Sequence, residues 1–333
     1  MHSLKAYGDG KVELVEEVTP TITAGEILIK PLAVGICGTD LDIVESKIDP
    51  AFVKYPVTLG HEWCGAVLDC GADVRSVSIG DRVVVQGIIP CEKCHECRSG
   101  NTNRCETYDE YGFTRDGACS SGIVAEERLV HKISPSVSNE SAALVEPTAV
   151  VTTGLLKANP MPGAKILIIG DGTIGLITAT LVRSWMPERI DLVGLRNEQA
   201  PLVTLTGVDN FLQATTHNAE MYDLVIEASG SKSGVEMALK KIVRGGKLLL
   251  LGFIGHEVSI PLVVDDVVNG DFSIYGSFGY TSVAWVKTVG LLNSGELDLT
   301  FLVTHQFALS DWKIGFNALK NASAPRGKVL LLP

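Results

Sequence analysis

A glycine-rich turn between an apolar strand and a helix constrains the fold of this chain more than any other feature. The segment 163–196 runs from the apolar stretch KILIIG through GDGTIG and a helix-compatible stretch ending near Pro187 to a second apolar run, IDLVGL. Short β-rich apolar runs predict buried parallel strands. Gly170, Gly172 and Gly175 permit a tight turn, close approach of a pyrophosphate and close helix–strand packing. We therefore expect a dinucleotide to bind here, with helix N-terminal N–H groups facing its phosphates.

Further apolar runs indicate that this turn belongs to a larger sheet. YDLVIEASG occupies 222–230 and GGKLLLLGF occupies 245–253. Strands that alternate with helices predict an α/β fold with a doubly wound parallel sheet, which binds ligands at the carboxyl ends of its strands. The candidate cofactor-binding residues are therefore Gly170, Gly172, Thr173, Ile174, Gly175, Gly194, Leu195, Arg196, Ser229, Leu251 and Gly252.

The end of the second strand bears on the choice between NAD and NADP. NAD-selective folds usually have Asp or Glu there, which binds the adenosine ribose hydroxyl and repels a 2′-phosphate. Counting from Gly170, that position is about Gly194, followed by Leu195 and Arg196, and none of the three is a carboxylate. Arg196 could pair with a 2′-phosphate through two N–H groups. We expect NADP to be preferred over NAD; the alternative is a solvated Arg196 in a protein that uses NAD.

Four of the eight cysteines lie in the stretch CEKCHECRSGNTNRC at 91–105. Thiolates at such short spacings can converge on one tetrahedral zinc ion. Four sulfurs fill the coordination sphere, so this lobe would stabilise a loop and take no part in chemistry. In a reducing compartment such clusters favour metal over disulfides. The sequence therefore predicts a structural zinc site formed by Cys91, Cys94, Cys97 and Cys105.

Donor residues of a second, mixed kind are spread along the chain. Cys37 lies in GICGTD, His61 and Glu62 lie side by side in LGHEWCGAV, and Glu146 lies in ALVEPTAV. Taken singly, each is more typical of a core or hydrogen-bonded residue. Together, one thiolate, one imidazole and one or two carboxylates form a mixed zinc site, and three protein ligands leave a fourth position free for water or a substrate oxygen.

The order of these motifs resembles a known family. CGTD, GHE, the four-cysteine lobe, EP and the later glycine turn follow one another as in the zinc-containing medium-chain alcohol/polyol dehydrogenases, and the resemblance covers essentially the whole chain. It implies that Cys37, His61 and Glu146 hold a catalytic zinc, with Glu62 as an alternative or exchanging ligand. Many simple alcohol dehydrogenases have a cysteine where this chain has Glu146, and the glutamate resembles the sorbitol, glucose and threonine dehydrogenase branches.

The resemblance also implies a reaction, in which hydride passes between a secondary alcohol and NAD(P) and a ketone forms. Thr39 matches the hydroxyl that relays the alcohol proton to the cofactor ribose. Other alcohol dehydrogenases have a histidine five residues after the zinc cysteine, where this chain has Asp42; that carboxylate could accept a proton, bind a polyol hydroxyl or be solvated.

Two features favour a polyhydroxylated substrate. The zinc site is rich in carboxylates, and GHEWCGAV with YGFTRDGAC at 111–119 resembles the deoxy-scyllo-inosamine dehydrogenases, which oxidise a ring hydroxyl. We expect a cyclitol, aminocyclitol or sugar alcohol. The alternatives are a threonine- or glucose-type dehydrogenase, a zinc-free quinone reductase-like enzyme and a non-catalytic binding homologue.

Composition bounds the remaining properties. The chain has 333 residues, 46% of them apolar, which is sufficient for two hydrophobic cores. Its net charge of −11 is unfavourable for binding nucleic acid or an anionic membrane. We expect a cytoplasmic homodimer or homotetramer. The resemblance implies a GroES-like, mostly-β catalytic domain over 1–149 and 279–333, a Rossmann domain over 150–278, and an active site in the cleft between them.

Overall fold

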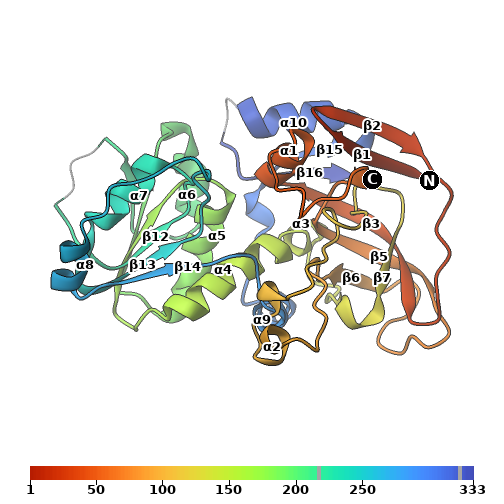
Figure 1. Cartoon of the computed structure of the whole chain (residues 1–333), viewed down its shortest axis with the longest axis horizontal. Coiled ribbons are helices and arrows are strands. Elements are labelled where there is room, and N and C mark those ends of the chain that lie inside the picture. The colour runs from red at the N-terminus through yellow and green to blue at the C-terminus, as the bar shows by residue number, and fades with distance from the viewer. Residues whose placement is uncertain (216–218, 322–324) are drawn as a thin grey trace. The chain divides into compact units, whose positions relative to one another are not determined.

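The structure is a computed structural model that describes residues 1–215, 219–321 and 325–333 (Figure 1). The chain forms two compact units. The first comprises Met1–Glu146, Tyr280–Ala322 and Lys328–Pro333, and the second comprises Pro147–Gly279 and Ser323–Gly327.

Two sheets form the first unit within the described residues. The larger has seven strands in the order β15–β16–β3–β5–β6–β8, with β7 also paired to β3; the smaller has the order β2–β1–β4. Their bounds are β1 (His2–Gly8), β2 (Lys11–Glu16), β3 (Glu26–Ile36), β4 (Val57–Thr58), β5 (Glu62–Cys70), β6 (Arg82–Val85), β7 (Ile123–Glu126), β8 (Val130–Lys132), β15 (Val303–Ala308) and β16 (Lys328–Leu332).

Strand β3 forms the centre of the larger sheet. Its sequence EILIKPLAVGI buries Ile27 and Ile29 on alternate positions and then becomes wholly apolar and buried towards Ile36. It pairs antiparallel with β5 on one side and β16 on the other. Strands β3 and β16 come from opposite ends of the chain, so the C-terminal strand completes the core around the N-terminal one.

The helices of the first unit range from single turns to α9, which has 13 residues. Helix α10 packs on β15 and β16, as Figure 1 also shows. The helix α4 begins in this unit and continues into the second. The bounds are α1 (Gly38–Val44), α2 (His95–Arg98), α3 (Asn139–Ala142), α4 (Val145–Ala158), α9 (Ser282–Ser294) and α10 (Trp312–Asn321), with the 3₁₀ helix η1 (Thr102–Arg104).

The second unit contains the parallel sheet that the sequence predicts. Its described strands follow the order β11–β10–β9–β12–β13–β14, and every neighbouring pair is parallel. In chain order this is 3-2-1-4-5-6, the doubly wound arrangement of dinucleotide-binding folds. The strands are β9 (Lys165–Ile169), β10 (Arg189–Gly194), β11 (Asn210–Gln213), β12 (Tyr222–Glu227), β13 (Ile242–Leu250) and β14 (Ser273–Gly276), and the helices are α5 (Thr173–Leu181), α6 (Ala200–Leu205), α7 (Lys232–Leu239) and α8 (Val264–Gly270).

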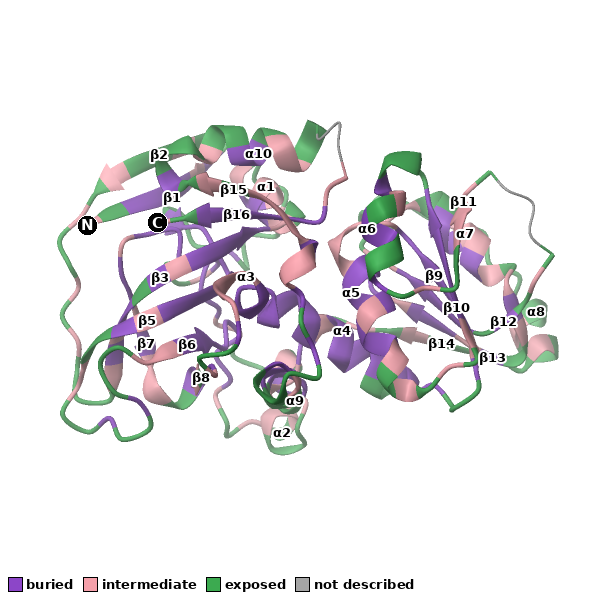
Figure 2. Ribbon diagram, turned by 180° about the vertical axis from the view of Figure 1, so that it is seen from behind, coloured by how far each residue is buried: buried purple, intermediate pink, exposed green. Residues whose placement is uncertain are grey.

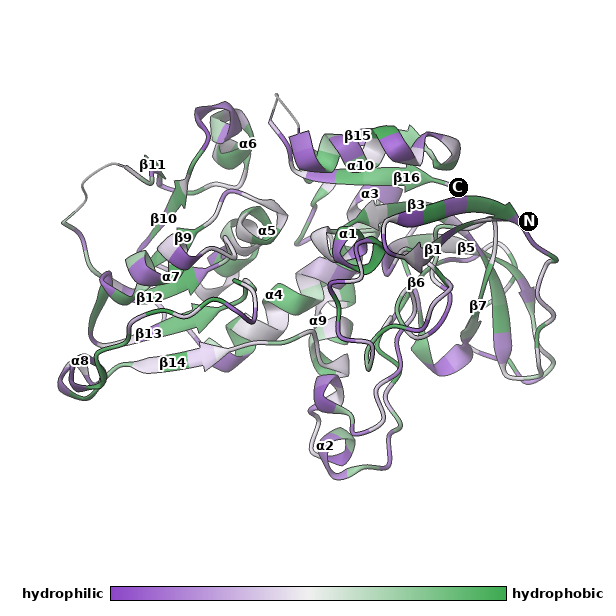
Figure 3. Cartoon of the chain, turned by 45° about the horizontal axis from the view of Figure 1, so that its top comes forward, coloured by the Kyte–Doolittle hydropathy of each residue, from purple (hydrophilic) through white to green (hydrophobic). Residues whose placement is uncertain are grey.

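The central strands of this sheet are buried on both faces. Figure 2 shows β9, β10 and β12 in purple, and Figure 3 shows β9, β12 and β13 as apolar. Ile166, Leu167 and Ile168 are each at most 1% exposed. Continuous apolar runs such as KILII are what a strand covered by helices on both sides requires.

Within the described residues, no helix has the length and apolar character needed to cross a lipid bilayer.

Candidate metal and dinucleotide sites

Cys37 lies at the junction between β3 and α1. Its backbone is extended, and its N–H donates to the Asp40 carboxylate at 2.8 Å. Asp40 thereby satisfies a backbone donor that the first turn of a helix leaves without an intrahelical partner. The Thr39 hydroxyl lies 3.5 Å from the Cys37 sulfur. The cap thus fixes the thiol and the predicted relay hydroxyl side by side at the end of a central strand.

The pairing of β5 with β3 brings the second donor pair to Cys37. Glu62, the first residue of β5, lies opposite Gly35, two residues before Cys37. The donor atoms of Cys37, His61 and Glu62 all lie within 4.8 Å of one another. His61 and Glu62 are buried, at 5% and 2% exposed. Thiolate, imidazole and carboxylate are all zinc ligands, so the residues present fit a zinc ion with an open coordination position.

Glu146 lies beside this group rather than within it. Among the described residues, the compact donor group contains Glu62 and does not include Glu146. Glu146 is buried in the first turn of α4. Burial raises the pKa of Glu146 to about 8, with a further contribution from the charge of Glu62 and an opposing one from His61. Its carboxyl group therefore lies in the electrostatic field of the donor group.

Asp40 also contacts the imidazole. Its Oδ1 lies 3.5 Å from His61 Nδ1, and both side chains are buried. Burial alone would lower the pKa of His61, but Asp40 and, to a smaller extent, Cys37 outweigh it and raise the pKa well above its usual value. A carboxylate at one ring nitrogen orients the ring and leaves the other nitrogen to a metal. The sequence reasoning missed this role, although Asp40 is part of the quoted CGTD motif.

Lys328 is the second residue that sequence reasoning missed. It begins β16 and forms an ion pair with Glu62, with the side chains 3% and 2% exposed. Gly35 makes room for the pair, because a Cβ there would lie 2.5 Å from Glu62 Oε2 and 2.6 Å from Lys328 Cε. Burial opposes charging of Lys328, whereas the charges of Glu62 and Cys37 raise its pKa. Lys328 therefore supplies a cation beside a thiolate- and carboxylate-rich group.

The four-cysteine lobe forms a separate sulfur cluster. The sulfurs of Cys91, Cys94, Cys97 and Cys105 all lie within 4.8 Å of one another, around α2 and η1, and none forms a disulfide. The Cys91 and Cys97 sulfurs are 4.0 Å apart, close to the edge of about 3.8 Å that a ZnS₄ tetrahedron requires.

Backbone N–H groups surround these sulfurs. Cys94 N–H donates to the Cys91 sulfur and Cys97 N–H to the Cys94 sulfur, each at 3.4 Å, and Cys91 N–H donates to the Cys105 sulfur at 3.3 Å. Hydrogen bonds from the N–H groups of Lys93 and Cys94 lower the pKa of Cys91 to about 6. Stabilised thiolates without an open position fit a structural zinc ion.

The glycine turn has the geometry that close approach of a ligand requires. Gly170 follows β9 with φ +123°, and Gly172 precedes α5. A Cβ on Gly175 would lie 1.9 Å from the Gly170 carbonyl oxygen, so only glycine allows α5 to pack this tightly on the turn. Thr173 and Ile174 are half-exposed in the first turn of α5. The remaining predicted residues also lie at carboxyl ends of strands: Gly194, Leu195 and Arg196 at β10, Ser229 after β12, and Leu251 and Gly252 after β13.

Asp171 changes the chemistry at the end of β10. Although it lies inside the glycine turn, its Oδ2 accepts hydrogen bonds from the N–H groups of Leu195 and Arg196, each at 3.2 Å. The Arg196 guanidinium lies 3.9 Å from Asp171 Oδ1. Burial lowers the pKa of Arg326, and the charge of Arg196 lowers it further. The position where sequence reasoning found no carboxylate therefore has one, supplied by a different segment and accompanied by two arginines.

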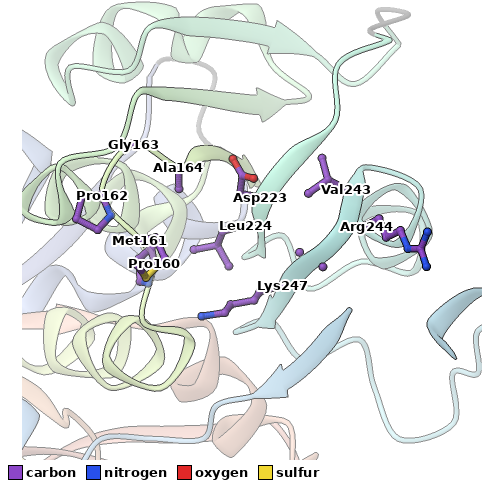
Figure 4. Close-up of a pocket in the computed structure, with 12 residues that line it drawn as sticks. Pro160, Met161, Pro162, Gly163, Ala164, Asp223, Leu224, Val243, Arg244 and Lys247 are labelled. Carbon is purple, nitrogen blue, oxygen red and sulfur yellow. The ribbon is translucent and has the colours of Figure 1, made fainter. Parts of the chain in front are cut away.

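The pocket drawn in Figure 4 lies elsewhere on the same sheet. It has a volume of about 280 Å³ and is lined by residues 160–164, 223–224 and 243–247. These segments lie at the amino ends of β9 and β12 and around the first half of β13, at the sheet edge opposite the glycine turn. Ligands of doubly wound sheets bind at the carboxyl edge, so this pocket is not the expected dinucleotide site.

Comparisons with known proteins agree with this geometry. Residues 23–135 match the model of the alcohol dehydrogenase GroES-like domain. The chain is 33% identical to the sorbitol dehydrogenase of Bacillus subtilis over 302 residues, covering 87% of this chain and 85% of that protein. It is 29% identical to the L-threonine 3-dehydrogenase of Shewanella frigidimarina over 330 residues, covering 96% and 95% of the two chains.

Solved structures share the whole fold. A zinc-binding dehydrogenase from Sinorhizobium meliloti bound to NADP superposes with a TM-score of 0.93, and an alcohol dehydrogenase from Escherichia coli in complex with NADH superposes with a TM-score of 0.92. Each comparison covers 100% of this chain and 99% of the other, at 23% identity. The GroES-like domain, the parallel sheet with its glycine turn and the sorbitol dehydrogenase relative together show that this chain is an enzyme belonging to the zinc- and NAD(P)-dependent medium-chain alcohol/polyol dehydrogenases.

Proposed function

We propose that this enzyme oxidises one secondary hydroxyl of a cyclitol, aminocyclitol or sugar alcohol to a ketone and transfers the hydride to NADP in preference to NAD. The observation that carries the proposal is the compact sulfur–nitrogen–oxygen donor group of Cys37, His61 and Glu62, with Glu146 beside it. Several carboxylates around one open metal position suit a substrate with many hydroxyl donors.

Each residue has a distinct task in this proposal. Cys37 and His61 hold the zinc together with one carboxylate, Glu146 or Glu62. The bound zinc supplies a Lewis acid that makes the substrate hydroxyl easier to ionise. Asp40 orients His61, and Lys328 draws Glu62 into an ion pair. The Thr39 hydroxyl, beside Cys37, accepts a hydrogen bond from the substrate hydroxyl and moves its proton away.

Asp42 lies two residues after Asp40 on α1 and is half-buried. Burial raises its pKa above the usual range for aspartate. A carboxylate in this state can exchange a proton more readily near neutral pH than an exposed one. The charges that act on Asp42 are those of Lys47, Glu45 and Lys320, so a solvated carboxylate stays an alternative beside the roles of proton acceptor and hydroxyl binder.

The proposed preference for NADP rests on two arginines. Arg196 and Arg326 lie near enough to each other at the end of β10 for the charge of Arg196 to lower the pKa of Arg326. Two guanidinium groups can bind a 2′-phosphate through charge-assisted hydrogen bonds. Asp171 opposes them, because its carboxylate already accepts the N–H groups of Leu195 and Arg196. The preference is therefore expected to depend on both arginines.

The test of this proposal combines substrates with both cofactors. Purified zinc-loaded enzyme is assayed with myo- and scyllo-inositol, their amino derivatives, sorbitol, glucose, L-threonine and short alcohols, each with NAD and NADP. The proposal expects the largest kcat/KM with a cyclitol or sugar alcohol and NADP, and a fall in NADP use in the Arg196→Ala and Arg326→Ala variants. A larger kcat/KM with L-threonine would favour the alternative that the threonine dehydrogenase relative represents. A strong NAD preference would overturn the cofactor assignment alone.

Assembly and compartment are further parts of the proposal. Strand β14 forms an edge of the parallel sheet, and Val264 and Val268 on the neighbouring helix α8 are 66% and 70% exposed. A sheet edge beside exposed valines favours pairing with a second copy. We propose a homodimer or homotetramer, located in the cytoplasm because thiolate clusters persist in reducing compartments. Light scattering at micromolar concentration that gives a single-chain mass would contradict this.

A further inference from the structure

A third glutamate lies close to the donor group, and neither the metal site nor the glycine turn accounts for it. Glu110 is 7% exposed, in the segment that links the four-cysteine lobe to β7. Its Oε2 accepts a hydrogen bond from the Tyr108 hydroxyl. Within the described residues, no lysine, arginine or histidine forms an ion pair with Glu110, and Oε1 has no hydrogen-bond partner.

Glu110 belongs to the same polar environment as the donor group. A Cβ added at Gly87 would lie 3.7 Å from both Glu110 Oε1 and the His61 carbonyl oxygen, and 3.0 Å from the Tyr280 hydroxyl. The absence of a side chain at Gly87 therefore lets the Glu110 carboxylate, the His61 carbonyl and the Tyr280 hydroxyl all lie close to the chain at this point. The charges of His61 and Glu110 interact, as do those of Glu110 and Glu146.

Burial of an ionised carboxylate with one neutral donor is unfavourable unless a cation joins it or it takes up a proton. Lys328, the lysine that contacts the donor group, is already paired with Glu62. Tyr108 donates its hydroxyl to Glu110, and its ring makes an edge contact with Phe52 at 5.1 Å between centroids. The protein therefore presents an acceptor oxygen near the site of oxidation and supplies no cation for it.

We propose that Glu110 binds a protonated amine of the substrate, so that the enzyme selects alcohols that bear an ammonium group over neutral polyols of the same shape. This inference rests on the proposed function, because it assumes that a hydroxyl of the same molecule is oxidised at the Cys37–His61 donor group. Glu110 is a specificity-determining residue: its Oε1 accepts the ammonium N–H, and Tyr108 fixes the orientation of the carboxylate through Oε2.

The experiment compares matched pairs that differ only in the amine. The pairs are trans-2-aminocyclohexanol against trans-1,2-cyclohexanediol and scyllo-inosamine against scyllo-inositol, assayed at about pH 8, where the amines are protonated and a carboxyl with a pKa raised to about 7 is ionised. Cyclohexylamine, which has no hydroxyl to oxidise, is titrated calorimetrically into the enzyme. The variants are Glu110→Gln, Tyr108→Phe and, as a matched control, Glu106→Gln, whose side chain is exposed four residues away.

We expect wild-type kcat/KM to be about ten- to a hundredfold larger for each amine than for its hydroxyl partner, the range of one charge-assisted contact. In Glu110→Gln this ratio falls at least tenfold and cyclohexylamine binding weakens by a similar factor. Tyr108→Phe lowers the ratio less, and Glu106→Gln leaves it unchanged.

Two other outcomes distinguish this inference from the proposed function. If wild type oxidises the diols and amines equally, or if the amine preference survives in Glu110→Gln, the role of Glu110 is wrong while the dehydrogenase assignment stands. If wild type oxidises no alcohol of the panel but binds cyclohexylamine through Glu110, the amine site stands and the proposed substrate class is wrong. Calorimetry keeps the test informative should a variant lose activity through a change in folding, because thermal unfolding of each variant is measured alongside.

Discussion

At the scale of single residues, the buried pair of Lys328 and Glu62 depends on a precise fit between three strands. Gly35 on β3 leaves the space, Glu62 comes from β5 and Lys328 from β16. Both charges have left water, so each depends on the other for compensation. Loss of one partner leaves the other as an unpaired buried charge beside the proposed zinc donors.

The Lys328→Met variant tests this dependence. We expect it to lower the free energy of unfolding by about 3–5 kcal/mol, because Glu62 is left charged and buried. The matched control is Lys320→Met, which removes the exposed pair with Glu45 and is expected to change stability by less than about 1 kcal/mol. Urea unfolding of both variants gives the comparison. Equal losses in the two would show that the buried pair contributes no more than a surface one.

The ionisation of Glu110 gives a pH-dependent prediction. Burial raises its pKa from 4.5 to about 7, so the folded state favours the protonated form. Its stabilising contribution is fully present below about pH 4.5 and is lost as pH rises to about 7. Relative to wild type, Glu110→Gln is therefore expected to gain up to about 3 kcal/mol between pH 5 and pH 8. Unfolding of both proteins at pH 5 and at pH 8 measures this gain. A stability difference between variant and wild type that does not change with pH would show that ionisation of Glu110 does not oppose folding.

Sequence reasoning predicted the donor residues but not the residues that support them. Cys37 and His61 lie in short motifs with recognisable neighbours, and the four thiols are close together in the chain. Lys328 acts on Glu62 only because β16 joins the sheet of β3, a long-range pairing without a local signal. Asp171 likewise reaches the end of β10 from the preceding turn, so a carboxylate is present where the count along the strand found none.

At the scale of elements, the strand–turn–helix unit of β9 and α5 forms the proposed dinucleotide site. The apolar run and the glycine spacing predicted this unit from sequence, because both the strand and the turn are specified locally. The exact strand order of the sheet follows from crossovers between distant segments and needed the structure. The pairing of the C-terminal strand β16 with β3 also joins distant segments, so it likewise needed the structure.

The Gly175→Ala variant tests the packing of this unit. Its new Cβ would lie 1.9 Å from the Gly170 carbonyl oxygen, whereas a Cβ at Gly172 would have no other atom within 4 Å. We expect Gly175→Ala to lower the free energy of unfolding by about 2 kcal/mol or more and to abolish dinucleotide binding. Gly172→Ala should change stability by less than about 1 kcal/mol. Fluorescence titration with NADPH and urea unfolding are the measurements, and equal tolerance of the two alanines would refute the packing argument.

At the scale of the whole molecule, the described residues of the first unit contain two donor groups of different character. Four sulfurs close one of them, and a sulfur, an imidazole and a carboxylate leave the other open. This unit is assembled from three separate stretches of chain, so the sequence order of its motifs showed which residues belong together without showing how they meet. We therefore propose that the closed group serves stability and the open one serves chemistry.

The most direct test of this division is the zinc content and activity of the Cys37→Ser variant, measured together by elemental analysis, circular dichroism and alcohol oxidation. We predict a folded protein that retains about one zinc per chain where wild type has two, and whose kcat is at least a thousandfold lower. A variant that still holds two zinc ions per chain, or that oxidises alcohols at close to the wild-type rate with one, would contradict the assignment of catalysis to the Cys37–His61 donor group.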